Sequence, residues 1–283
     1  MVGGGNMPIW NAVLLGAIHG IAEFLPVSSS GHFAIVNNLF KLSDISQEHP
    51  LFLALLYLAS LASVCIVYWR EITSMYEELI SFAGFGPLAG QERARYPAAR
   101  CFLMLVLGSL PLLLALPINS RMGVLNDRNI FIGVMLILTG CILFISDKML
   151  PGKKNMNSIS VTDALIIGLC QSVSTIPGLS RAAVTITAGM AVGLRRSVAV
   201  SFSFLLSIPA VFGAAMLSLG DAIRMGINWS FVPAYLIGTA VALLTGVGAI
   251  LLMRYIGRNR KFGGFSYYCW VIGVLSIILY LIF

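Results

Sequence analysis

The chain has 283 residues, of which 58% are hydrophobic and 10% are charged, with a mean hydropathy of +0.93. About a quarter of the residues of a soluble domain are charged, so this composition excludes an ordinary soluble protein and indicates an integral membrane protein. The net charge of +7 does not indicate nucleic-acid binding, because the basic residues lie in short loops between apolar stretches.

The apolar stretches are of two kinds when they are taken in chain order. A spanning helix needs about 20 mostly apolar residues, and six stretches meet that length, whereas two others are broken by Pro and Ser and predict re-entrant hairpins. The longest polar connection, residues 70–97, predicts a loop with short amphipathic pieces. In order, the sequence predicts a hairpin at 8–25 and 31–40, spans at 50–69, 98–118 and 130–147, a hairpin at 163–176 and 182–194, and spans at 198–220, 231–253 and 265–283.

The two broken stretches are copies of one motif, 152 residues apart, in which Gly16 corresponds to Gly168 and His19 to Gln171. Each copy precedes three spans, and because three is odd, the second hairpin must enter from the opposite face. We therefore predict an all-α polytopic membrane protein with two inverted-topology repeats, each a re-entrant helical hairpin plus three transmembrane helices. The repeats cover about 7–147 and 161–283 within a single membrane domain, 1–283.

The basic residues predict how this arrangement is oriented. With Arg181 set aside, thirteen Lys and Arg fall on one side of the predicted topology and four on the other. By the positive-inside rule the richer side is cytoplasmic. We therefore expect a multi-pass protein of the cell membrane, with both termini and the mouth of the first hairpin, which holds the active site, facing outward.

Two ionisable residues in the first hairpin are candidates for chemistry. Glu23 lies in an otherwise apolar stretch, where a carboxylate is costly and is functional by default, although it could instead be a buried polar group satisfied by a neighbouring helix. His32 follows a serine cluster nine residues later. Either residue could transfer protons, and Glu23 could also bind a metal ion.

The second hairpin supplies features that suit an anion. Ser28–Ser30 and Ser180 each precede a helical stretch and are candidate N-caps, and a helix N-terminus is a ready anion site. Arg181 presents a planar fork that matches phosphate oxygens, and Thr185 lies about one turn beyond it. A structural alternative is a pair between Arg181 and Glu23 across the repeat interface.

Together these residues describe a pocket for a phosphate group with a carboxylate and a histidine nearby. The ligand most consistent with it is a phosphorylated amphiphile whose tail stays in the lipid bilayer. The sequence contains no P-loop and no G-x-S-x-G elbow.

Three motif stretches of the chain are distinctive. They are Glu23-Phe24-Leu25-Pro26-Val27-Ser28-Ser29-Ser30-Gly31-His32, Pro177-Gly178-Leu179-Ser180-Arg181, and Ser203-Phe204-Leu205-Leu206-Ser207-Ile208-Pro209. These stretches resemble the motifs of the undecaprenyl-diphosphatase family, also known as bacitracin-resistance proteins. The resemblance implies hydrolysis of undecaprenyl diphosphate to the monophosphate, which recycles the lipid carrier for cell-wall synthesis, with a divalent cation, Mg²⁺ or Ca²⁺.

The resemblance also implies roles for individual residues. Glu23 is implied as the metal ligand, with His19 as a second candidate. Ser29 and His32 match the candidates for nucleophile and acid/base, with direct attack by His32 as the rival to attack by Ser29. The implied diphosphate-binding group is Ser28, Ser180, Arg181 and Thr185.

Three positions depart from the family pattern. His19 stands where a Glu or Gln is usual, Tyr57 where a Gln or His is common, and Ser201 where an acidic residue is expected. The loss of oxygen ligands weakens binding of Mg²⁺ or Ca²⁺. A transporter or flippase of polyprenyl phosphates is therefore the alternative function, and the oligomeric state is open, with a homodimer as one option.

Overall fold

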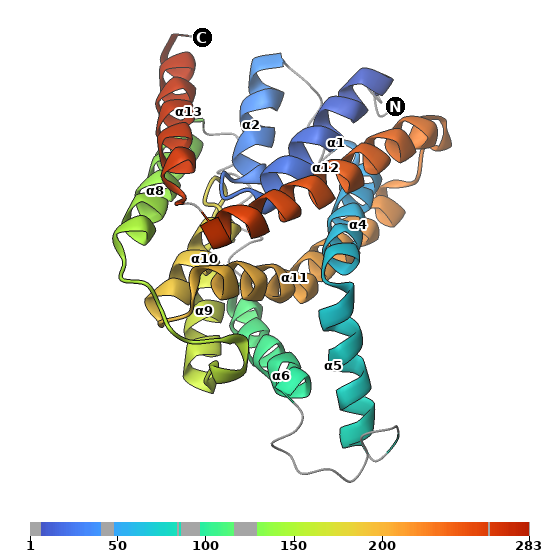
Figure 1. Ribbon diagram of the computed structural model, residues 1–283. Helices are drawn as coiled ribbons and strands as arrows, with labels where there is room; N and C mark the ends of the chain where they lie inside the picture. Colours follow the sequence, from blue (N-terminus) through green and yellow to red (C-terminus); the bar gives the residue numbers. More distant parts are fainter. Residues whose placement is uncertain are drawn as a thin grey trace.

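The computed structural model describes residues 7–40, 48–83, 85, 97–115, 129–259 and 261–282, and this part of the chain is built from helices with no strand among them (Figure 1). The α-helices are α1 (Ile9–Phe24), α2 (Ser29–Phe40), α4 (Pro50–Val67), α5 (Trp69–Phe82), α6 (Pro97–Ser109), α8 (Asn129–Lys148), α9 (Val161–Val173), α10 (Arg181–Ala191), α11 (Arg196–Met225), α12 (Val232–Asn259) and α13 (Gly263–Ile282). The 3-10 turns are η2 (Leu110–Ala115), η4 (Met156–Ser158) and η5 (Trp229–Phe231).

Six helical segments of the described chain are long and apolar enough to cross a membrane, which confirms the prediction of a multi-pass helical protein. They correspond to the six predicted spans, and their outer surfaces carry large exposed hydrophobic side chains, as a lipid-facing surface requires. The segments are Pro50–Val67, Pro97–Leu114, Ile130–Lys148, Arg196–Met225, Trp229–Asn259 and Gly263–Ile282.

Each broken motif forms two helices joined by a short tip. In the first, α1 ends before Pro26, and Ser28 adopts a positive φ of 71° before α2 begins. In the second, α9 ends before Pro177, and Gly178 has a φ of 85° before α10 begins. Proline removes a backbone donor and a positive φ reverses the chain, so both helices must stop and turn at these points.

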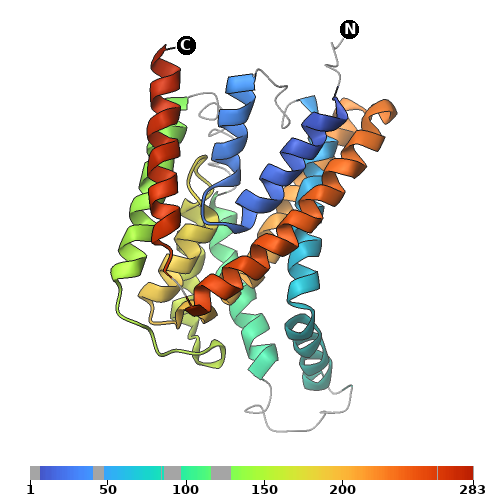
Figure 2. The ribbon, with the colours of Figure 1, turned by 45° about the horizontal axis from the view of Figure 1, so that its top comes forward.

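The two tips meet inside the protein. The Gly178 amide of the second tip donates a hydrogen bond of 3.2 Å to Ser30 Oγ of the first. The base of the second hairpin is closed where Lys154 N donates to Gly193 O. The start of α1 and the end of α13 lie at one end of the molecule in Figure 2, while the start of α9 lies toward the other.

Glycines let the first helix of each hairpin pack closely against a spanning helix. A Cβ on Gly16 of α1 would overlap the carbonyl of Gly238 in α12. A Cβ on Gly168 of α9 would likewise overlap the carbonyl of Gly108 in α6. Such contacts between backbones are typical of helix packing in membranes, and here they fix where each hairpin tip lies.

The amphipathic part predicted within the connection 70–97 is the helix α5, which extends over Trp69–Phe82. Residues 84 and 86–96 of that connection lie outside the described part of the chain. The apolar residues of α5, Ile72, Met75, Tyr76 and Leu79, recur at helical spacing and line the cavity described below. The Glu78 carboxylate accepts hydrogen bonds from the amides of Ala98 and Ala99, at 2.6 and 2.9 Å, and so caps the start of α6.

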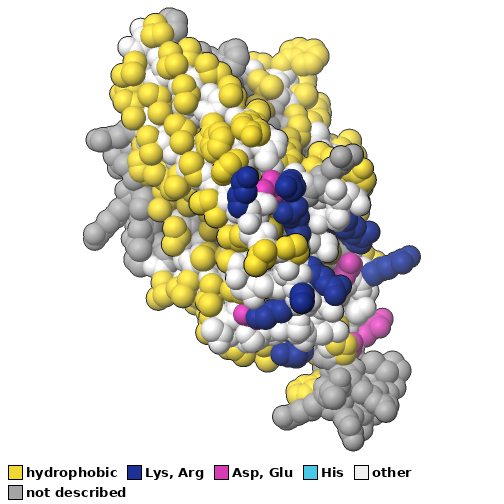
Figure 3. All heavy atoms as spheres, turned by 60° about the vertical axis from the view of Figure 1, so that its left-hand side comes forward, with side chains coloured by type: hydrophobic (Ala, Val, Ile, Leu, Met, Phe, Trp, Pro, Cys, Tyr) yellow, Lys and Arg dark blue, Asp and Glu magenta, His cyan; other side chains and the backbone are white. Residues whose placement is uncertain are grey.

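The predicted span 98–118 also ends differently. The α-helix stops at Ser109 and continues as the 3-10 turn η2, because Pro111 cannot donate a helical hydrogen bond. Residues 116–118 lie outside the described part of the chain. Basic side chains gather toward one end of the molecule in Figure 3, away from a broad hydrophobic surface.

Candidate active site

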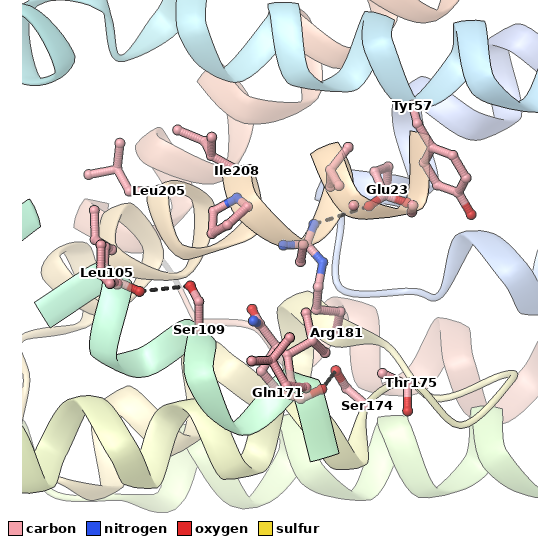
Figure 4. Close-up of a pocket in the computed structure, with 18 of the residues that line it drawn as sticks. Glu23, Tyr57, Leu105, Ser109, Gln171, Ser174, Thr175, Arg181, Leu205 and Ile208 are labelled. Atoms are coloured by element: carbon pink, nitrogen blue, oxygen red, sulfur yellow. Dashed lines mark hydrogen bonds and ion pairs between the residues drawn. The ribbon is translucent and has the colours of Figure 1, made fainter. Parts of the chain in front are cut away.

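A cavity of about 1170 Å³ lies where the hairpin tips meet α4, α5, α6 and α11. Its polar residues come mainly from the two tips and α9, and the rest of its wall is apolar (Figure 4). Sites for drug-sized ligands have volumes of about 300–1,000 Å³, so this cavity is larger than a diphosphate alone requires.

Three predicted site residues are joined by hydrogen bonds at the polar end. Ser29 Oγ donates to Glu23 Oε2 at 2.7 Å, and Arg181 Nη2 donates to Glu23 Oε1 at 3.1 Å. The Glu23 and Arg181 side chains are 10% and 16% exposed. The structural alternative, a pair between these two residues, is therefore present, but Arg181 Nη1 has no hydrogen-bond partner among the described residues. The guanidinium thus keeps an amino group for a ligand.

The serines at both tips act as helix caps. Ser28 Oγ accepts from Gly31 N at 3.2 Å, and Ser180 Oγ accepts from Ala183 N at 3.3 Å. The N-termini of α2 and α10 therefore lie at the junction of the tips, where their dipoles favour an anion. Ser28 and Ser180 line the cavity, and their contact with a phosphate remains a prediction.

His32 is directed away from Ser29. Its Nδ1 lies 2.7 Å from Ser28 O and its Nε2 lies 2.8 Å from the Tyr268 hydroxyl, on α13. The two rings stack with centroids 5.6 Å apart. Both ring nitrogens are thus occupied, and the carboxylate of Glu23, rather than His32, is the base within hydrogen-bond reach of Ser29.

Thr185 is also separated from the cavity wall. Its hydroxyl donates to Arg181 O at 2.8 Å and lies 2.6 Å from Ser203 Oγ of α11, where it is 1% exposed. This arrangement does not support direct contact between Thr185 and a phosphate. It supports a role in holding α10, and hence Arg181, against α11.

The three departures from the family pattern have different surroundings. His19 is buried between the rings of Phe33 and Tyr57, at centroid distances of 5.6 and 5.4 Å. Tyr57 lines the cavity. Ser201 lies 3.4 Å from the Tyr68 hydroxyl, in the contact between α11 and the junction of α4 with α5.

The donors at the site fit a cation only in part. Among the described residues no three His, Cys, Asp or Glu side chains come together as metal ligands. His19 is enclosed by aromatic rings, and each Glu23 oxygen already accepts a hydrogen bond. Mg²⁺ is nevertheless commonly bound by one or two carboxylates together with substrate phosphates. Among the described residues the site therefore offers one carboxylate, Glu23, to a cation, and phosphate oxygens of a substrate would be the further ligands.

Gln171 is a site residue that the sequence reasoning did not select. It lines the cavity, it is 1% exposed, and neither atom of its amide has a hydrogen-bond partner in the described structure. A buried unsatisfied polar group costs about 1–3 kcal/mol, so its presence calls for an explanation. The correspondence of Gln171 with His19 in the repeated motif was the available signal.

The fold and the site together define a class: a multi-pass helical membrane protein with a hydrogen-bonded serine, carboxylate and arginine at the polar end of a largely apolar cavity. The model of the bacitracin resistance protein BacA family matches residues 12–275. The chain therefore belongs to this family.

Curated relatives agree over nearly their full length. The chain is 34% identical to an undecaprenyl-diphosphatase of Desulforapulum autotrophicum over 276 residues, which are 96% of this chain and 98% of that protein. It is 30% identical to one of Methanosphaera stadtmanae over 278 residues and 32% identical to one of Halothermothrix orenii over 281 residues, with the same coverage of both chains.

Proposed function

We propose that this protein is an integral membrane phosphatase that hydrolyses undecaprenyl diphosphate, or a related polyprenyl diphosphate, to the monophosphate and inorganic phosphate. The observation that carries the proposal is the hydrogen-bonded set of Ser29, Glu23 and Arg181 at the polar end of a largely apolar cavity. A serine with an adjacent base and an arginine is suited to phosphoryl transfer, and the apolar wall suits a prenyl tail. The product would re-enter the lipid-carrier cycle of cell-wall synthesis.

In the first step Ser29 Oγ attacks the terminal phosphorus of the diphosphate. The Ser29 proton moves to Glu23 Oε2, the new Oγ–P bond forms, and the bond from that phosphorus to the bridging oxygen breaks. The leaving group is the polyprenyl monophosphate. Arg181 and the N-termini of α2 and α10 stabilise negative charge on the transferring group.

In the second step water hydrolyses the phosphoserine. Water supplies the oxygen that bonds to phosphorus, the Oγ–P bond breaks, and inorganic phosphate leaves. Glu23 gives its proton to the departing Ser29 oxygen and takes up the proton lost by the attacking water. That proton then passes to the leaving phosphate or to bulk water, so Glu23 is again a carboxylate and Ser29 again a hydroxyl. Attack by His32 is the rival, and its ring would first have to leave Ser28 O and Tyr268.

A divalent cation, Mg²⁺ or Ca²⁺, remains part of the proposal. Glu23 is the carboxylate of the site that would hold it, with diphosphate oxygens as further ligands. When bound, it would neutralise charge on the diphosphate. His19 would join it only by turning out from between Phe33 and Tyr57.

Two architectural features also remain proposals. The inverted repeat is supported by the meeting of the tips, and by the paired close contacts of Gly16 with Gly238 and of Gly168 with Gly108. The outward orientation of both termini rests on the distribution of basic residues. A homodimer is a further prediction, which the mass of the purified protein in detergent would test.

The decisive experiment is phosphate release from undecaprenyl diphosphate by the purified protein. We expect turnover that requires Ser29. A protein that binds the lipid and moves it between leaflets of a vesicle without releasing phosphate would overturn the phosphatase proposal and establish the alternative, a polyprenyl-phosphate flippase.

A further inference from the structure

The amide of Gln171 is the feature of the cavity wall that the proposed chemistry does not use. The side chain is buried in the wall, with both amide atoms unpartnered among the described residues. In Figure 4 it points from α9 toward the interior of the cavity, on the same side as Arg181. A buried amide without partners indicates a ligand that completes its hydrogen bonds.

Arg181 also has a buried group without a hydrogen-bond partner among the described residues. One of its amino groups is held by Glu23 at 3.1 Å, whereas Nη1 has no partner in the described structure. An anion that reached both Nη1 and the Gln171 amide would satisfy two buried polar groups at once. A phosphate offers several acceptor oxygens for such a contact.

The position of Gln171 along the cavity follows from the packing of α9. Gly168, one turn before Gln171, contacts the backbone of Gly108 in α6. Gln171 therefore lies on the side of α6, next to the apolar part of the wall. In Figure 4, Gln171 and Arg181 lie between Leu105, Leu205 and Ile208 on one side and Glu23 on the other.

We propose that Gln171, together with Arg181 Nη1, binds the phosphate that is attached to the lipid tail. The inference rests on the proposed function, and it fixes the direction in which the substrate lies. The tail occupies the apolar part of the cavity, the proximal phosphate lies at Gln171, and the distal phosphate lies at Ser29.

The chemistry of an amide suits this position. Gln171 Nε2 donates to a phosphate oxygen without adding a positive charge, and Oε1 can accept from a water molecule that accompanies the anion. The proximal phosphate remains on the product. A neutral donor therefore positions the substrate while it holds the product less tightly than a second cation would.

The test compares two probes that should depend on different residues. Undecaprenyl monophosphate carries only the proximal phosphate, whereas orthovanadate mimics the phosphoryl group on the serine nucleophile. Binding of each would be measured on the purified protein, by inhibition and by the shift in Tm. For Gln171→Leu we expect affinity for the monophosphate to fall about tenfold or more, while inhibition by vanadate is unchanged. For Ser29→Ala, which has too little turnover for inhibition to be measured, the shift in Tm is the readout. We expect affinity for vanadate to fall while affinity for the monophosphate is unchanged.

Stability gives a second readout. Because the Gln171 amide has no partner among the described residues, Gln171→Leu should leave the Tm of the ligand-free protein unchanged or raise it. Gln171→Asn, which keeps an amide but draws it back, should also lose monophosphate affinity. The matched control is Ser172→Ala, since Ser172 Oγ bonds to Gly168 O within α9 at 3.1 Å and does not line the cavity.

Monophosphate affinity that is unchanged in both Gln171 variants would overturn the inference. An equal loss of affinity for the monophosphate and for vanadate would also overturn it, as would a lowered Tm of the ligand-free protein. Phosphate release by the wild-type protein is measured separately. A failure of the proposed hydrolysis can therefore be told apart from a failure of the Gln171 assignment, which is measured by binding.

Discussion

Ser29 donates a hydrogen bond of 2.7 Å to Glu23 across the break that separates α1 from α2. The hydroxyl and the carboxylate are held together before any substrate arrives, and the proposed attack on phosphorus uses both groups. We expect Ser29→Ala and Glu23→Gln each to lower kcat by about 10²–10⁴-fold, measured as phosphate release from undecaprenyl diphosphate.

His32→Ala is the informative comparison, because His32 contacts Ser28 O and Tyr268 instead of Ser29. Its loss should lower kcat much less than the loss of Ser29 does. If His32→Ala were inactive while Ser29→Ala kept its turnover, the roles of Ser29 and His32 would have to be exchanged.

Arg181→Lys tests the geometry of the guanidinium. Arg181 bonds to Glu23 with one amino group, its Nη1 has no partner among the described residues, and in the proposed function Nη1 binds a phosphate. A single ammonium cannot occupy both positions. We expect activity to fall roughly 10²–10³-fold, as for the loss of one transition-state donor, with expression and Tm close to wild type. Turnover at the wild-type rate would remove Arg181 from the diphosphate site.

The spans could be predicted from the sequence because each depends on one local property, a run of apolar residues of sufficient length. The predicted span 50–69 and the observed Pro50–Val67 differ by only two residues. For 70–97 the sequence predicted only short amphipathic pieces and not the full extent of α5, because charged residues such as Glu71 and Glu77 interrupt its apolar pattern. The apolar residues of α5 line the cavity, which exists only in the folded protein.

The composition of the site was predictable, but its pairings were not. Glu23, Ser29 and Arg181 stood out as polar residues in apolar stretches, and the structure joins them. The contact of His32 with Tyr268 spans 236 positions of the chain. No local pattern gives such a pair, so the base for Ser29 could not be chosen from sequence spacing.

The apolar part of the cavity should hold the prenyl tail, and two glycines of α11 allow a matched test. Gly213 lines the cavity and Gly220 does not, and nothing lies within 4 Å of a Cβ built on either. We expect Gly213→Trp to fill the tail site and to raise the KM for undecaprenyl diphosphate about tenfold or more, with little change for a short-chain prenyl diphosphate. Gly220→Trp should leave both values unchanged. Equal effects of the two variants would place the tail elsewhere.

Sidedness can be measured with single introduced cysteines. Glu48, before α4, and Asn155, before α9, are both exposed, and the predicted topology puts them on opposite sides of the membrane. On intact cells we expect Glu48→Cys to react with an impermeant thiol reagent and Asn155→Cys to react only after the membrane is opened. The opposite pattern would invert the topology and turn the mouth of the first hairpin inward.

The pH dependence of stability should carry a contribution from Asp163, at the start of α9. Burial is the largest influence and raises its pKa, but hydrogen bonds from Lys154 and Ser160 together hold the pKa of Asp163 below its usual value. Lys154 Nζ lies 2.9 and 2.8 Å from the two carboxylate oxygens. A carboxyl group with a lowered folded-state pKa adds stability above its unfolded pKa, about 3.9, and loses it as the pH falls through the folded value.

We therefore expect the Tm of the protein in a non-ionic detergent to fall more steeply below about pH 4 for the wild type than for Asp163→Asn. Above that pH the variant should be less stable by about 1 kcal/mol, a value typical of a partly exposed pair. Lys154→Met removes the same pair from the other side and should reduce the slope in the same way. If the difference in Tm between wild type and Asp163→Asn were constant across this range, Asp163 would not be linked to folding through its proton.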